Sequence, residues 1–243
     1  MSYVLIVGAK SDIAKEVARV YAKNGYNLYL GARAVNELEE FKTDLEVRSG
    51  VSVELIELDI TAYDTHQALY ENLSEKPLGV VVVAGYMTEQ HKAEKEWSET
   101  LNTINVNYTG AVSLLNIVAN DFEKEKRGFI VGVSSVAGDR GRKANYIYGS
   151  AKAAFSAYLS GLRNRLFESG VAVLTVKPGF VNTKMTENLA LPEKLTAQPA
   201  EVAQDLFKAQ QAGKNILYTK WVWRYVMLII THIPEFIFKK LSI

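Results

Sequence analysis

The sequence predicts a single α/β domain in which a doubly wound parallel sheet of about seven strands has helices on both faces. Short apolar runs alternate with helical patterns from one end of the 243 residues to the other. The runs 3–7 and 79–85 are apolar throughout, which is typical of parallel strands buried on both faces. No Pro/Ser-rich linker and no internal repeat divides the chain, so one domain is the simplest interpretation.

Turn and cap residues mark the ends of the expected elements. Asp12 is expected to cap the first helix, and Asn24-Gly25 to end it. Pro178-Gly179 ends the sixth strand. The expected strands are 3–7, 27–30, 51–58, 79–85, 129–133, 171–176 and 215–218, and the expected helices are 13–23, 61–73, 94–120, 146–168 and 200–211.

The composition excludes several functional classes. A formal net charge of +1 predicts no nucleic-acid partner, because such a partner needs a clustered basic face. The absence of cysteine excludes disulfides, thiol catalysis and thiolate metal sites, and it fits a cytoplasmic protein. The three histidines show no metal-ligand spacing and the first residues show no signal-peptide pattern, so we expect neither a metal site nor secretion.

Tyr148 and Lys152 are the strongest candidates for chemistry. They lie four residues apart in an expected helix and therefore share one face. A free phenol titrates near pH ~10, and a neighbouring ammonium lowers its pKa, which makes tyrosine usable as a general acid or base. The hydroxyl of Ser135 could hold a carbonyl oxygen beside the phenol, with Ser134 as the adjacent alternative. By itself the pair would fit a packed tyrosine and a solvated lysine equally well.

The turn after the first strand suits a phosphate. Gly8 permits a tight turn and lets the backbone approach a pyrophosphate at a helix N-terminus. Asp12 and Ala14 stand where two further glycines are usual in dinucleotide-binding turns. A carboxylate repels phosphate, so we expect Asp12 to cap the helix and to leave the donors of Lys10 and Ser11 to the anion. An ordinary βα turn would look similar.

Taken together these landmarks resemble the short-chain dehydrogenase/reductase family over residues 1 to about 220. The resemblance implies a Rossmann-like fold and hydride transfer between a nicotinamide cofactor and a carbonyl or secondary alcohol. Tyr148 would donate the proton to the carbonyl oxygen in reduction, and Ser135 would orient that oxygen. Lys152 would lower the pKa of Tyr148 and bind the nicotinamide ribose. Asn107 would hold a water that links Lys152 to solvent.

The end of the second strand predicts the cofactor. In this fold an acidic residue there favours NAD, whereas NADP enzymes supply a cation. Ala32 occupies the acidic position and Arg33 follows it. A guanidinium matches phosphate geometry, so Arg33 with Lys10 or Ser11 predicts NADP(H) rather than NAD(H). The alternative is an Arg33 that is merely solvated.

The resemblance also implies the rest of the cofactor site, with Asp59 and Ile60 beside the adenine. The chain departs from the family at Val82-Val83, where asparagines are usual. The implied cofactor-binding residues are Gly8, Lys10, Ser11, Asp12, Ile13, Arg33, Asp59, Ile60, Ala84, Gly85, Tyr148, Lys152, Pro178, Gly179, Val181 and Thr183.

The tail 221–243 is apolar, rich in aromatic residues and flanked by lysines. Its apolar run is under half of the ~20 residues that a membrane span needs, so we expect two short helices separated near Pro234 and no span. The tail could pack on the domain, form a dimer interface or lie in a membrane interface, the last being slightly disfavoured. The turn 11–14 and the step 233–236 are similar to decaprenylphosphoryl 2-keto-ribose reductases, which implies a lipid-linked carbonyl substrate.

These observations predict an NADP(H)-dependent oxidoreductase that acts on a small-molecule or lipid-linked ketone or secondary alcohol. The segment 184–198 is expected to form a lid over the substrate. The helices 94–120 and 146–168 resemble the family's dimerisation helices, which implies a homodimer or homotetramer. The alternatives are a non-catalytic NADP-binding sensor, which the altered glycine turn and Val82-Val83 would suit, and a membrane-associated scaffold.

Overall fold

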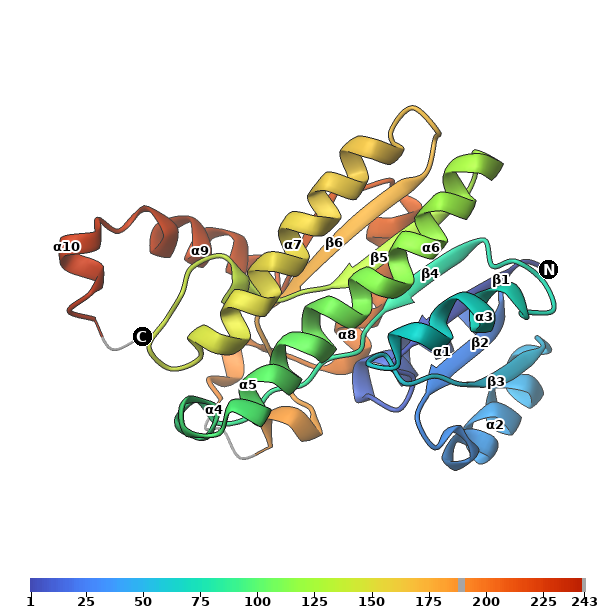
Figure 1. The fold of residues 1–243 in the computed structure, drawn as a ribbon, viewed down its shortest axis with the longest axis horizontal. Coiled ribbons are helices and arrows are strands. Elements are labelled where there is room, and N and C mark those ends of the chain that lie inside the picture. The colour runs from blue at the N-terminus through green and yellow to red at the C-terminus, as the bar shows by residue number, and fades with distance from the viewer. Residues whose placement is uncertain (188–190, 242–243) are drawn as a thin grey trace.

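The computed structural model of the protein describes residues 1–187 and 191–241 (Figure 1). Seven parallel strands form one sheet in the order β3-β2-β1-β4-β5-β6-β9, which confirms the doubly wound architecture. The order reverses between β1 and β4, so the crevice for a ligand is expected at the carboxyl ends of these strands. The strands are β1 (Tyr3–Val7), β2 (Asn27–Ala32), β3 (Val53–Glu57), β4 (Gly79–Val82), β5 (Phe129–Val133), β6 (Ala172–Pro178) and β9 (Ile216–Thr219).

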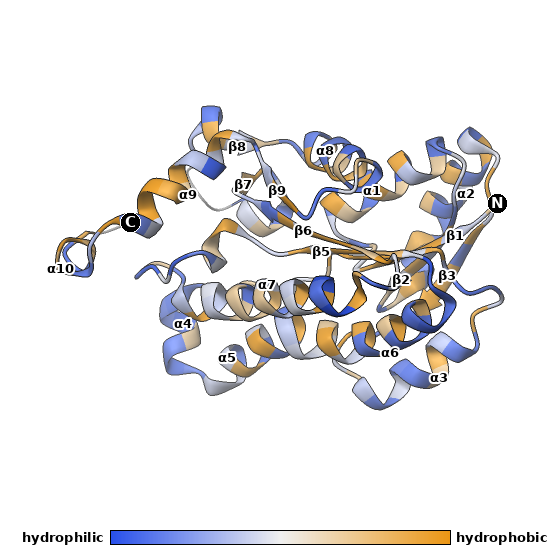
Figure 2. Cartoon of the chain, turned by 90° about the horizontal axis from the view of Figure 1, so that it is seen from above, coloured by the Kyte–Doolittle hydropathy of each residue, from blue (hydrophilic) through white to orange (hydrophobic). Residues whose placement is uncertain are grey.

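Helices cover both faces of the sheet, as Figure 2 shows from above. One layer contains α1, α2 and α8, and the other contains α3 to α7. Side chains alternate between the faces of a strand, so Val4 and Ile6 of β1 join the core under the first layer while Leu5 and Val7 join the other. The helices are α1 (Asp12–Lys23), α2 (Glu39–Ser49), α3 (His66–Glu71), α4 (Gln90–Lys95), α5 (Trp97–Ile104), α6 (Gly110–Glu125), α7 (Tyr146–Leu166) and α8 (Pro199–Gln211).

Two expected helical segments differ in the structure, and one helix was not expected. The region 94–120 is not one helix, because the extended backbone of Glu96 separates α4 from α5 and a π-helical turn at Asn105–Thr109 separates α5 from α6. The expected helix 61–73 is a 3-10 turn followed by the short α3. The helix α2 was not expected, because its apolar residues form no stripe in the sequence. In the structure only Leu45 of this helix is buried.

A second, two-stranded sheet joins the two ends of the expected lid. It pairs β7 (Phe180–Val181) with β8 (Thr196–Ala197). Short 3-10 turns occupy Lys184–Thr186 and Glu193–Leu195. Residues 188–190 of the lid lie outside the described residues.

The tail forms two short helices, α9 (Val222–His232) and α10 (Glu235–Phe238). As expected, the first ends before Pro234 and the second begins after it. In Figure 1 they extend away from the sheet. Within the described ranges, no helix is both long enough and apolar enough to span a membrane. Residues 242–243 of the tail lie outside the described residues.

Candidate active site

A cavity of about 450 Å³ lies at the carboxyl ends of the strands. It receives side chains from the β1–α1 turn, from the ends of β4 and β5, from the start of α7 and from the segment after β6. The predicted site residues that line it are Lys10, Ser11, Asp12, Ile13, Gly85, Ser135, Tyr148, Lys152, Pro178, Gly179, Val181 and Thr183. Gly8, Arg33, Asp59, Ile60, Ala84 and Asn107 are not among its lining residues.

Ser135 and Tyr148 form a hydroxyl pair in this cavity. Burial raises the pKa of Tyr148 to about 12, and the hydrogen bond with Ser135 acts in the opposite direction. Ser134 is not equivalent, because its buried Oγ contacts the Lys152 carbonyl at 2.9 Å and the Ser156 hydroxyl at 2.8 Å. Ser135 is therefore the serine that accompanies the phenol.

Lys152 lies on α7 one turn after Tyr148 and is only 3% exposed. Its Nζ donates a hydrogen bond to the Val133 carbonyl at 3.1 Å and lies 5.8 Å from the centroid of the Tyr148 ring. Burial lowers the pKa of Lys152 to about 8. The expected lowering of the Tyr148 pKa by Lys152 is not observed in this geometry, because burial of the phenol outweighs other effects. A phenol with this pKa is protonated at neutral pH and can serve as a proton donor.

Asn107 lies in the π-helical turn and is hydrogen-bonded on both sides of its amide. Its Nδ2 donates to the carbonyls of Tyr86, at 2.6 Å, and Thr103, at 2.8 Å, while its Oδ1 accepts from the Tyr86 N–H at 3.3 Å. Gly85 lies between Asn107 and Lys152, since an added Cβ would be 3.3 Å from Asn107 Oδ1 and 3.6 Å from Lys152 Nζ. The structure thus brings the amide and the ammonium to the same small space.

The β1–α1 turn has the close backbone packing expected of a phosphate-binding turn. Gly8 has a φ of +85°, and an added Cβ would lie 2.7 Å from the Ala84 backbone. The expectation that Asp12 caps α1 is wrong, because Ser11 is the N-cap and its Oγ accepts from the Ala14 N–H at 3.2 Å. Asp12 is the first helical residue, and its carboxylate accepts from the Lys184 N–H at 2.9 Å. The carboxylate therefore connects the turn to the expected lid.

Arg33 and Asp59 are not among the residues that line the cavity, whereas Lys10 is. Arg33 is exposed and contributes to the lowered pKa of Asp59, for which the hydrogen bond from the Thr61 N–H is the largest cause. Lys10 forms an ion pair with Glu37 at 2.6 Å. Ile60 is buried against α6, where its carbonyl would be 2.0 Å from a Cβ added to Gly110. Arg33 is therefore the more available of the two predicted cations.

Sequence reasoning missed several lining residues, and Trp223 of the tail is the largest. Trp223 is 4% exposed, and its Nε1 donates to the Leu195 carbonyl at 3.0 Å. Its ring meets Phe180 edge to face with centroids 5.3 Å apart. A Cβ added to Gly179 would be 1.9 Å from Trp223 Nε1, so glycine is required at this contact. The other missed lining residues include Met87, Val136, Arg142, Asn145 and Phe180, whereas Met185 belongs to the predicted lid.

The tail therefore packs on the domain through one of its faces, which was one of the three alternatives. Trp223 and Met227 are buried there with Val136. The only signal for this packing in the sequence is the apolar character of the tail, which does not identify the partner.

Comparison with known proteins identifies the class to which this fold and site belong. The family profile described as short chain dehydrogenase matches residues 2–194. A protein named as an uncharacterized oxidoreductase from Mycobacterium tuberculosis is 33% identical over 241 residues, which cover 98% of this chain and 96% of the relative. The chain therefore belongs to the short-chain dehydrogenase family of oxidoreductases, as the resemblance implied.

Solved structures share the fold. A short-chain dehydrogenase from Sphingobium yanoikuyae in complex with NADPH has a TM-score of 0.84 and 23% identity, covering 97% of both chains. An alcohol dehydrogenase from Comamonas testosteroni described as specific for bulky-bulky ketones has a TM-score of 0.81 and 21% identity, covering 97% of this chain and 96% of that one.

Proposed function

We propose that this protein is an NADP(H)-dependent oxidoreductase that interconverts a ketone and a secondary alcohol. The observation that carries the proposal is the convergence of Ser135, Tyr148 and Lys152 on one cavity at the carboxyl ends of the strands. The similar structure from Sphingobium yanoikuyae was solved with NADPH, which supports the choice of cofactor.

The residues present fit a dinucleotide. The absence of a side chain at Gly8 keeps the β1–α1 turn within contact distance of Ala84, and the turn leads into the N-terminus of α1, where an anion is stabilised. Arg33 would hold the 2′-phosphate of NADP(H), since no acidic residue occupies the end of β2. The bound nicotinamide would supply or accept the hydride.

The protein would supply positioning and proton transfer. Tyr148, protonated at neutral pH, would donate to the carbonyl oxygen of the substrate, and Ser135 would hydrogen-bond the same oxygen. Lys152 would bind the ribose hydroxyls, and Asn107 would hold a water through which the proton is replaced. The segment 184–198 would close over the substrate, with the Asp12–Lys184 hydrogen bond at its base.

Replacing Tyr148 by Phe tests the enzymatic role. General acid catalysis contributes about 10²- to 10⁴-fold, so we expect Tyr148→Phe to lose turnover to that extent and to bind NADPH as the wild type does. Turnover is followed by NADPH oxidation with a panel of ketones, and binding by fluorescence titration. A non-catalytic sensor would show no turnover in the wild type and no change in the variant. The control is Tyr146→Phe, two residues away, which removes a hydroxyl that donates to Glu94 and belongs to a residue outside the cavity lining.

Cofactor choice is tested at Arg33. Loss of a charge-assisted hydrogen bond to phosphate costs about 1.5–3 kcal/mol, so Arg33→Ala should weaken NADPH binding by about 10- to 100-fold and leave NADH binding unchanged. Arg19→Ala, at an exposed arginine of α1, is the matched control. Equal affinities of the wild type for NADPH and NADH would contradict the role of Arg33.

The exposed face of the tail supports membrane contact and an apolar or lipid-linked substrate. Trp221, Tyr225, Leu228 and Ile229 are exposed large apolar residues at helical spacing, and Lys220, Arg224, Lys239 and Lys240 add positive charge. The scaffold alternative would require vesicle binding without turnover. We expect the double change Leu228→Glu with Ile229→Glu to abolish sedimentation with anionic vesicles, whereas Val47→Glu, at an exposed valine of α2, should not.

A homodimer or homotetramer is also proposed. Trp97 and Leu101 of α5 and Tyr146 of α7 are exposed apolar residues, and α5 packs against α7, so two neighbouring helices present apolar side chains to a partner. Light scattering of the wild type should give a multiple of the mass of one chain. Leu101→Glu should shift it toward the monomer, and a monomeric wild type would refute the interface.

A further inference from the structure

We propose that the cavity contains an oxyanion subsite, formed by the guanidinium of Arg142, which selects ketones and alcohols that also have a carboxylate or phosphate group. The inference rests on the proposed function, because it names the class of substrate for the same site. It adds a binding element that neither the fold nor the Ser135/Tyr148/Lys152 arrangement requires.

Arg142 and Asn145 line the cavity together with Ser135 and Tyr148. Across residues 1–187 and 191–241, the Nε of Arg142 and the Oδ1 of Asn145 are buried side-chain atoms without a hydrogen-bond partner. Buried polar atoms in folded proteins are nearly always paired, and an unpaired one points to a missing ligand or water. Here one unpaired donor, on a cation, and one unpaired acceptor border the same cavity.

The charge of Arg142 is not neutralised by its surroundings. Burial lowers the pKa of Arg142, and Asp139 is the acidic residue that acts against this effect. Asp139 is already bound, since it forms an ion pair with Lys177 and accepts a hydrogen bond from the Tyr218 hydroxyl at 2.9 Å. A guanidinium remains protonated in proteins, so a half-buried positive charge lines the cavity.

Arg140, in the same loop, provides a comparison, because its guanidinium has hydrogen-bond partners within the protein. Its guanidinium donates to the carbonyls of Ile230 and Ile233, both at 2.6 Å, and pairs with Glu235 at 2.8 Å. It also stacks on the Phe238 ring at 3.6 Å. Arg140 thus holds the tail with all of its contacts made inside the protein, whereas Arg142, two residues later, presents an unpaired donor to the cavity.

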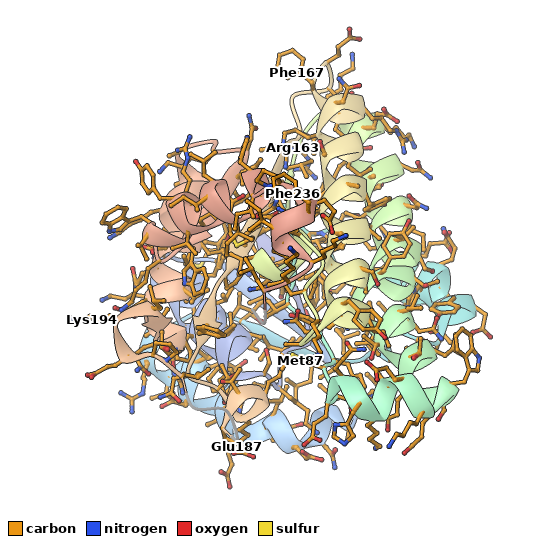
Figure 3. All side chains as sticks on the ribbon, turned by 90° about the vertical axis from the view of Figure 1, so that its left-hand side faces the viewer. Met87, Arg163, Phe167, Glu187, Lys194 and Phe236 are labelled. Carbon is orange, nitrogen blue, oxygen red and sulfur yellow. The ribbon has the colours of Figure 1, made fainter. Side chains whose placement is uncertain are left out.

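The position of the two residues assigns the subsite to the substrate. Arg142 and Asn145 belong to the loop that connects Ser135 to Tyr148, the two groups proposed to bind the carbonyl oxygen. The phosphate-binding turn is a separate segment, after β1. The remaining wall is largely apolar and includes Met87, seen in the middle of the face in Figure 3. The cavity therefore fits an apolar substrate with one oxyanion near its carbonyl.

The test compares charged and neutral probes of the same carbon skeleton. One pair is an aliphatic γ-keto acid and its methyl ester, and the other is a keto-alkyl phosphate and the corresponding hydroxyketone. NADPH oxidation gives kcat/KM for each, and calorimetry gives the affinity of each for the protein saturated with NADP⁺. The first pair tests a carboxylate and the second a phosphate as the source of the oxyanion.

We expect the wild type to prefer the charged member of at least one pair by about 10- to 100-fold in both measurements, the range of a charge-assisted hydrogen bond. Arg142→Met should abolish that preference and change the values for the neutral probes by less than about threefold. Lys143→Met is the matched control, since Lys143 is an exposed cation beside Arg142, and it should retain the preference.

Asn145→Asp provides a second variant of nearly the same shape. Asn145 is the N-cap residue of α7 and its side chain makes no cap hydrogen bond, so the change removes none, and it places a negative charge beside Arg142. It should weaken the charged probes by repulsion and spare the neutral ones. Equal affinities for charged and neutral probes in the wild type, or equal losses for both in Arg142→Met, would overturn the subsite. If NADPH is not oxidised with any probe, the reductase proposal fails, while the calorimetric comparison still decides whether the oxyanion is bound.

Discussion

The two walls of the cavity are built differently. Ser135, Tyr148 and Lys152 come from the end of β5 and the start of α7, and Lys152 is hydrogen-bonded to the last residue of β5. A second wall includes Trp223 and Phe180, which come from segments after β9 and β6 and pack in a small separate cluster with Val136. Figure 1 shows α9 extending from the body, whereas α7 lies along the sheet.

We propose that this difference separates the residues that carry the chemistry from those that recognise the substrate. Residues held by the central sheet cannot move without disturbing the main core, so their geometry is preserved. The second wall can change in sequence and position with the loss only of the contacts within its small cluster. We therefore expect variants of the first wall to lose turnover and variants of the second to change substrate affinity and local stability.

The largest effect is expected at Lys152 and would sharpen this contrast. Lys152→Met should reduce kcat by about 1000-fold, since the proposed proton relay and the proposed ribose contact would be lost. Burial lowers the pKa of Lys152 from 10.5 to about 8, so its charge costs about 3 kcal/mol at neutral pH. The variant should therefore be more stable by about that amount in urea unfolding. Loss of both activity and stability would contradict this account.

The pH dependence of stability checks the same residue. Between pH 8 and 10.5 the unfolded chain keeps the Lys152 proton and the folded chain has lost it, so the contribution of Lys152 to stability rises with pH across this window. The stability difference between Lys152→Met and the wild type should shrink over this range. A constant difference would indicate an ordinary pKa for Lys152.

Trp223→Ala should affect the second wall. Truncation of a buried tryptophan costs about 3–5 kcal/mol, and because the tail has its own small cluster, we expect the loss as local opening of α9. Hydrogen exchange of α9 should accelerate and KM should rise, while kcat changes less. Trp221→Ala, at a tryptophan that is 73% exposed, is the control and should stay within about 0.5 kcal/mol. A loss of kcat with unchanged KM would break the proposed separation of the two walls.

Arg140→Ala should have an intermediate effect. It leaves two carbonyls of the α9 C-terminus and the Glu235 carboxylate without their partner, at a cost of about 1–3 kcal/mol. Exchange protection should fall in α9 and α10 and remain unchanged in β5 and α7. Protection lost equally in the central sheet would show that the tail is part of the main cooperative unit.

The smallest effect is expected at Asp12. Asp12→Ala removes the acceptor for the Lys184 N–H and should cost about 1 kcal/mol. Exchange at Lys184 should accelerate and NADPH affinity should change by less than about threefold, since the α1 cap at Ser11 remains. A large loss of helical stability would restore the capping role that the sequence suggested.

The sequence by itself determined the parallel sheet, the position of its strands and the candidate catalytic residues. Apolar runs predict strands that are buried on both faces. Because the carboxyl ends of parallel strands meet at one edge of the sheet, the sequence also predicts that Ser135 and the β1–α1 turn lie at the same edge. The breaks in the expected helix 94–120 were missed because no proline or glycine lies between residues 94 and 109 to mark them. The helix α2 was missed because it buries only Leu45.

Only the tertiary structure decided which distant residues meet. Trp223 approaches Gly179, and the carboxylate of Asp12 binds Lys184, because helix and strand packing joins segments far apart in the chain. The periodicity of apolar residues predicts that a side chain is buried, but it does not identify the residues against which that side chain packs. The pKa values of Tyr148 and Lys152 depend on that surrounding material, since desolvation outweighs the effect of the neighbour four residues away. For the same reason the sequence did not single out Arg142. Its Nε is unpaired because the nearby carboxylate of Asp139 is already bound by Lys177 and Tyr218.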